Sequence, residues 1–353
     1  MSTPLQINII ESNQASGSNV GQYSYSDVDV TAVSDANHWY GHSIAPGQDV
    51  QLNIIQSNQA SGTNIGQSAS TDVDVLVASL QAHPNVGTVQ VNYIGQNAPS
   101  GSNIGQSIAA DVDITAAGGA GTTQVNSIQA NEASGLGISQ HQQLDSDVLT
   151  TTAAAGHSNG PATTTTTNAI QQNAATGSNI GQSMSADVDV GTHAAGGDAP
   201  VSFTQTNLAQ SNQASGTNLY QAQSVDVGVT STNVADWNGH HHHWEPSGAP
   251  NIQTDVIQSN SASGSNMHQF QSADVDVIAI STSTHHLPSG LDDTLVQTTV
   301  QQVNDAAGTA IAQVQDVNVD VFAAQSTWDS HAMASKLAGL GDAIHTNILQ
   351  HNA

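Results

Sequence analysis

The chain has 353 residues, and its 28 acidic side chains face a single basic one, Lys336, which gives a formal net charge of −27. A surface with a single basic side chain cannot neutralise phosphates, so the chain has no electrostatic footprint for nucleic acid or anionic lipid, and nucleic acid is close to excluded as a partner. The absence of cysteine excludes disulfides and cysteine-ligated zinc, and no apolar run is long enough to span a bilayer.

An internal repeat organises the chain from its first residues onward. Residues 57–75, SNQASGTNIGQSASTDVDV, are one of eight copies of a pattern centred on a glycine. The eight glycines are Gly17, Gly62, Gly101, Gly135, Gly177, Gly216, Gly264 and Gly308. Near-copies in one chain favour a folded repeat protein, although an aromatic content of 3% alone would be typical of disorder.

Each unit predicts a strand, a turn at the glycine and a second strand. In the second unit the residues after the glycine alternate with period two, which places Val73 and Val75 on one face and Asp72 and Asp74 on the other. In the first strand, the frequent Ile seven residues before the glycine and the invariant Asn four residues before it have opposite parity. That mismatch predicts a bend or bulge between them.

Two architectures fit such units: antiparallel hairpins side by side, or a solenoid in which equivalent positions stack. Every unit has an Asn four residues before the glycine and a Gln five residues after it, namely Asn13, Asn58, Asn97, Asn131, Asn173, Asn212, Asn260, Asn304, Gln22, Gln67, Gln106, Gln140, Gln182, Gln221, Gln269 and Gln313. Inward amides hydrogen-bonded to their copies would form ladders and satisfy buried polar groups, whereas exposed turn residues need no such identity. We therefore expect an all-β fold, a parallel β-solenoid of about eight strand-turn-strand coils.

The segments between units differ in length and hold most of the Pro, Trp and His. We expect loop excursions at residues 31–50, 76–90, 150–166, 191–204, 230–252 and 278–293. Their histidines, including the run 240–243, lack the spacing of structural zinc sites, which favours adventitious metal affinity.

The end of the chain predicts a different element. Residues 1–325 form the expected repeat domain, and residues 326–353 the expected short C-terminal helix. The helical stripe consists of Met333, Leu337, Leu340, Ile344 and Ile348. Such a segment could be a plain helix packed on the last coil, or it could cap the rod, join subunits or serve as an export signal.

Aspartates recur ten and twelve residues after the glycine. They are Asp27, Asp29, Asp72, Asp74, Asp111, Asp113, Asp145, Asp147, Asp187, Asp189, Asp226, Asp274, Asp276 and Asp320. Stacking would build two outward columns of carboxylates, hard oxygen ligands that suit Ca²⁺. The alternative is a solvated face that keeps rods apart. A catalytic pair is needed once, so repeated pairs indicate architecture, and we expect no enzyme activity.

The unit core IIQSNQASGTNIGQ resembles the curlin repeat of bacterial curli fibres and related functional-amyloid subunits. The resemblance implies a secreted, non-catalytic subunit whose coils continue from molecule to molecule in an extracellular or cell-surface fibre. The N-terminal residues lack the basic and apolar regions of a signal peptide, so export would follow another route.

The predicted fold also favours polymerisation, because a parallel solenoid ends in unpaired backbone groups that can act as templates for the next copy. The first unit begins almost at Met1, with no capping segment before it. The expected partner is the chain itself, with a matrix polysaccharide as a second candidate. The alternative function is a monomeric secreted solenoid that binds glycan or ice.

Overall fold

The computed structural model describes residues 5–34, 49–79, 85–118, 120–153, 162–195, 201–235, 250–283, 295–327 and 344–353. Within these ranges nearly every residue belongs to one sheet of nine parallel strands, which neighbour one another in chain order. The strands are β1 (Leu5–Ser34), β2 (Val50–Ser79), β3 (Asn85–Ala117), β4 (Ala120–Ala153), β5 (Ala162–Ala195), β6 (Val201–Ala235), β7 (Asn251–Ser283), β8 (Leu295–Thr327) and β9 (Ile344–Asn352). The prediction of an all-β parallel solenoid is confirmed.

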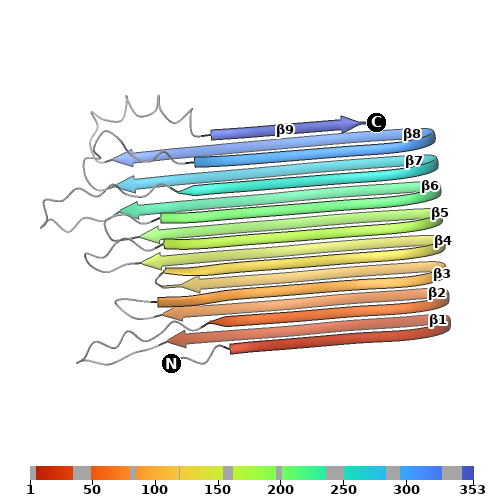
Figure 1. Cartoon of the computed structure of the whole chain (residues 1–353), viewed down its shortest axis with the longest axis horizontal. Coiled ribbons are helices and arrows are strands. Elements are labelled where there is room, and N and C mark those ends of the chain that lie inside the picture. The colour runs from red at the N-terminus through yellow and green to blue at the C-terminus, as the bar shows by residue number, and fades with distance from the viewer. Residues whose placement is uncertain are drawn as a thin grey trace, which may run out of the picture.

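Each of the first eight strands folds back at its middle and so forms one coil. The residues before the repeat glycine are here termed the first arm, and those after it the second arm. Figure 1 shows the coils stacked, with the turns along one side and the strand ends along the other. Gly17 pairs with Gly62, and Gly62 with Gly101, so equivalent residues form columns along the stack.

The turn requires glycine because of its backbone conformation. The repeat glycines have φ between +141° and +153°, and the residue two positions later, which is Asn in six of the eight coils, has φ between +53° and +66°. A Cβ on Gly62 would also overlap the carbonyl oxygen of Gly17 in the coil before it. Glycine therefore permits both the turn and the close stacking of successive turns.

The bend predicted in the first arm is absent, and that prediction was wrong. Pairing between β1 and β2 runs without interruption from Leu5 to Gly17. In β2, Ile54 and Asn58 are buried, whereas Ile55 is 37% exposed. Inward and outward residues alternate strictly, so the frequent Ile seven residues before the glycine faces the solvent.

Two apolar clusters lie between the arms. The larger one contains residues remote from the turn, such as Leu52 and Val73, and the smaller one lies next to the turn and includes Ile65. The buried amides of Asn58 and Gln67 come between the two clusters along the arms. The core of each coil therefore has a polar layer, whose hydrogen bonds position the two arms.

The C-terminal helix is not found in the described part of its segment. Ile344–Asn352 is strand β9, which pairs in parallel with the first arm of β8 and ends with Asn352 opposite Asn304. These residues thus repeat the first arm of a coil. Met333, Leu337 and Leu340 lie outside the described residues.

The strands extend further into the predicted excursions than expected. β1 continues to Ser34, and β5 begins at Ala162, so that threonines 163–167 belong to the sheet. Most of the remaining excursion residues, including histidines 240–243, lie outside the described ranges. Among the residues that are described, no helix is long and apolar enough to cross a membrane.

Candidate functional site: amide ladders and aspartate columns

The invariant Asn of each coil links both the two arms and successive coils. Nδ2 of Asn58 donates to Oδ1 of Asn97 in the next coil and to the backbone oxygen of Ser68 on the opposite arm, both at 3.0 Å. The same pair of hydrogen bonds recurs at Asn13, Asn97, Asn131, Asn173, Asn212, Asn260 and Asn304. Asn352 of β9 accepts the last bond of this ladder.

The Gln column forms a second ladder, which runs in the opposite direction. Nε2 of Gln182 donates to Oε1 of Gln140 in the preceding coil at 2.8 Å, and Gln221, Gln269 and Gln313 continue the series. The ladder is broken at Gln106, whose Nε2 donates instead to two backbone oxygens. All sixteen predicted ladder residues therefore face the interior. The hydrogen bonds between them are interrupted once, between Gln67 and Gln106.

Two atoms of the Gln column have no hydrogen-bond partner within the described structure. Oε1 of Gln67 lacks one because Gln106 turns away from it. Nε2 of Gln22 lacks one because β1 is the first strand of the sheet and no described coil precedes it. The Gln22 side chain is only 5% exposed, so water satisfies it poorly.

A third ladder was not predicted from the sequence. It consists of the residues six positions before the glycine, where Gln171, Gln210, Gln258, Gln302 and Gln350 each donate to the Gln of the preceding coil. A Gln two residues before the invariant Asn in six of the eight units was the signal that could have revealed it.

β3 departs from this third ladder and fills its place differently. Gly95 stands at the ladder position, and the Tyr93 ring occupies the space where a side chain at residue 95 would lie. The phenol oxygen of Tyr93 lies 3.3 Å from Oε1 of Gln56, to which it donates. Burial raises the pKa of Tyr93 above its ordinary value, so this donor stays protonated.

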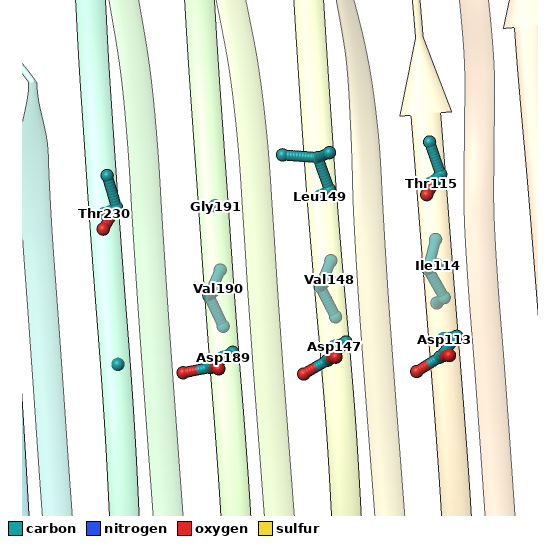
Figure 2. Close-up of a pocket in the computed structure, with 11 residues that line it drawn as sticks. Asp113, Ile114, Thr115, Asp147, Val148, Leu149, Asp189, Val190, Gly191 and Thr230 are labelled. Carbon is teal, nitrogen blue, oxygen red and sulfur yellow. The ribbon is translucent and has the colours of Figure 1, made fainter.

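All fourteen predicted aspartates lie at outward positions of the second arms. Strand pairing places Asp113 opposite Asp147 and Asp147 opposite Asp189, and Figure 2 shows these three side chains pointing the same way from neighbouring strands. The column continues past Gly228, where a Cβ would overlap the Asp189 carboxylate. The structure therefore brings the carboxylates together as open rows.

A shallow groove of about 520 Å³ follows part of this column. The three carboxylates of Figure 2 line it together with Leu149 and Thr230, while Gly191 and Gly228 contribute no side chain. Gly191 of β5 and Gly228 of β6 leave room for the groove because they have no side chain.

The aspartates raise one another's pKa values. Partial burial is the main cause and neighbouring carboxylates the second, and together they raise the pKa of Asp113 to about 6. The pKa values of Asp111, Asp145, Asp187, Asp189, Asp226 and Asp276 are raised by burial first and neighbouring carboxylates second. In water, unit charges about 4.8 Å apart repel by roughly 0.9 kcal/mol, so each row opposes its own stacking.

No convergent metal site was found in the described part of the chain. Its His, Asp and Glu side chains form no group of three or more that could hold a metal ion. A cation on the aspartate rows would therefore contact carboxylates of neighbouring coils along an open face.

Comparisons with known proteins add no relative. No protein-family model matches the chain, and neither a curated protein nor a solved structure does.

Proposed function

We propose that the chain is a structural subunit that polymerises end to end into an extracellular fibre. Similar coils stack in parallel with the repeat glycines in register, and a further coil supplied by another copy would extend the sheet in the same way. Unpaired edges of parallel sheets are templates for such addition. The repeated aspartates and amides have structural positions, and we assign no catalytic role to them.

The observation that carries this proposal is the unpartnered Nε2 of Gln22. In the other coils that continue the ladder, this atom donates to the Gln of the preceding coil, as Gln182 does to Gln140. The last acceptor among the described residues is Oε1 of Gln313, on the second arm of β8. A joined copy would close the ladder by bringing Gln22 onto Gln313.

Joining in this way has a geometric requirement. β9 pairs with the first arm of β8 and leaves its second arm without a partner among the described strands. When the second arm of a joining β1 lies on the second arm of β8, its first arm takes the position of β9. The proposed joint therefore requires displacement of β9.

Substitution of Gln22 tests the joint. We expect Gln22→Leu to slow filament elongation about tenfold or more, because the joint loses a buried hydrogen bond worth roughly 1–3 kcal/mol. The matched control is Tyr23→Ser in the same coil, where the outward side chain is 77% exposed. Elongation would be followed by light scattering from sonicated seeds. An unchanged rate for Gln22→Leu would contradict ladder closure at the joint, and discrete rods that never elongate would favour a monomeric binding module for glycan or ice.

We further propose that divalent cations stabilise the fibre by bridging carboxylates along the aspartate rows, and that Ca²⁺ is the preferred cation. The rows contain fourteen carboxylates and the whole chain one basic residue, so the basic side chains are too few to neutralise them. Hard oxygen donors at neighbouring positions suit Ca²⁺.

A further inference from the structure

The two outer faces of the solenoid differ sharply in charge. The middle of the first-arm face consists of four outward columns, represented in β2 by Gln51, Asn53, Ile55 and Ser57. Among the residues in register with these four from β1 to β9, Asp255 is the only carboxylate. The second-arm face carries the fourteen aspartates described above. The next outward column toward the turn adds Glu132 and Asp305, so the first-arm face holds few of the carboxylates of a chain with net charge −27.

A column of apolar side chains runs along the middle of the first-arm face. Six of its nine residues are isoleucines and a seventh is leucine, and strand pairing places Ile10, Ile55, Ile94, Ile128, Ile170, Ala209, Ile257, Gln301 and Leu349 in line. The exposed fraction of the isoleucine and leucine side chains in this column reaches 74% at Ile10 and is 37% at Ile55. Contiguous apolar surface of this kind marks an interaction site more often than scattered exposed residues do.

The neighbouring asparagine column is held rigid by its own ladder. Asn53, Asn92, Asn126, Asn168 and Asn207 each donate to the Asn of the preceding coil at 2.7–2.9 Å. Each internal amide already has one donor and one acceptor bond within the chain, which lowers the cost of removing it from water. Side chains fixed in this way also lose little conformational entropy when a partner covers them.

The face is large enough for a stable pair. Nine strands about 4.8 Å apart span roughly 38 Å, and four outward positions about 6.6 Å apart span roughly 20 Å, so the face covers roughly 760 Å². Standard protein interfaces bury about 800 Å² on each partner. A second copy presents a face of the same size and the same spacing of columns.

We propose that two copies of the chain pair laterally through their first-arm faces, with the isoleucine columns forming a dry seam of the steric-zipper type. A second copy is the occupant that the charges favour. Contact through the second-arm face would bring the aspartates of at least one molecule toward the partner, whereas pairing of the two first-arm faces holds both sets of aspartates on the outside of the pair. In a fibre the pair would make two rods lie side by side.

The test replaces three outward isoleucines by charges. We expect Ile55→Asp, Ile170→Asp and Ile257→Asp together to halve the mass per unit length of the particles, because charges would face each other across the seam. The matched control is Leu76→Asp, Leu149→Asp and Ile278→Asp on the second-arm face, where the side chains are about equally exposed. Analytical ultracentrifugation and scanning transmission electron microscopy at about 0.15 M salt would measure the mass.

A second triple variant distinguishes loss of pairing from loss of folding. Gln301 occupies the isoleucine column in β8, so Ile→Gln at the same three positions introduces a residue that the coil already accepts. We expect the Gln variant to weaken pairing while melting at a temperature close to that of the parent. Single-width parent particles, pairing that survives both triple variants, or equal loss of pairing in the control would overturn the proposal.

The readouts keep lateral pairing separate from end-to-end growth, because width and mass per length report pairing, and particle length reports growth. Single rods that instead bind ice or an insoluble polysaccharide through this face, and lose that binding in the Ile→Asp variant, would assign the face to a different partner.

Discussion

At the scale of single residues, buried amides take the place of apolar contacts in the layer between the two clusters. Gln182 shows how much depends on one side chain. Its Nε2 donates to Gln140 and to the backbone oxygen of Gln213, and its Oε1 accepts from Gln221. Each of these groups is removed from water, so the loss of one amide leaves several groups without a partner.

We therefore expect Gln182→Leu to lower the free energy of unfolding by about 1–3 kcal/mol for each group left unsatisfied. The control, Gln172→Leu, changes an exposed Gln of the same coil and should stay within about 0.5 kcal/mol of the parent. Chemical denaturation followed by circular dichroism measures both. Equal stability of the two variants would mean that the ladder contributes nothing to the fold.

At the scale of the element, the turn makes a specific demand on residue type. Gly177 has φ +148° and a Cβ there would overlap the carbonyl oxygen of Gly135, whereas a Cβ on Gly181 would meet no atom closer than 4.0 Å. Gly177→Ala should therefore destabilise the coil by about 1–3 kcal/mol, and Gly181→Ala should not. Thermal melting of the two alanine variants compares them directly, and similar melting temperatures would contradict the role given to the turn glycine.

The aspartate rows make stability depend on pH. Folding raises the pKa of Asp113 from 3.8 to about 6, so between these values the native chain holds protons that the unfolded chain has released. The free energy of unfolding should therefore increase as the pH falls through about 6, and this gain should be complete below the ordinary pKa. We expect a higher melting temperature at about pH 5 than at about pH 7.5.

The variant Asp111→Asn, Asp113→Asn provides the control for that prediction. It removes two carboxylates whose pKa values are raised, so its melting temperature should respond less to the same change in pH. A melting temperature that falls on mild acidification of the parent would contradict the assigned sign.

The coils and the outward aspartates could be predicted from the sequence because residues repeated in seven or eight units reveal columns. Two elements could not. An apolar residue normally faces inward, so the opposite parity of Ile55 and Asn58 predicts a bend, whereas Ile55 faces the solvent. Ile344 and Ile348 are four residues apart, a spacing that places two side chains on the same face of a helix and of a strand alike. The Tyr93 and Gly95 pair is a compensation within one coil, which repeat alignment does not reveal.

At the scale of the whole molecule, net charge opposes both stacking and pairing. If cations bridge the aspartate rows, Ca²⁺ should raise the melting temperature and lengthen filaments beyond the effect of Mg²⁺ or monovalent salt at matched ionic strength. The variant with Asp72, Asp74, Asp111 and Asp113 changed to Asn should lose part of this response. A parent that responds only to ionic strength would leave the rows as a solvated face.

The most direct test of end-to-end assembly is cryo-electron microscopy of the purified protein at about 0.15 M salt. The account predicts filaments in which the strand spacing of about 4.8 Å continues along the axis and across each junction between molecules. Discrete rods roughly 38 Å long, or filaments whose strand spacing is interrupted at every junction, would contradict it.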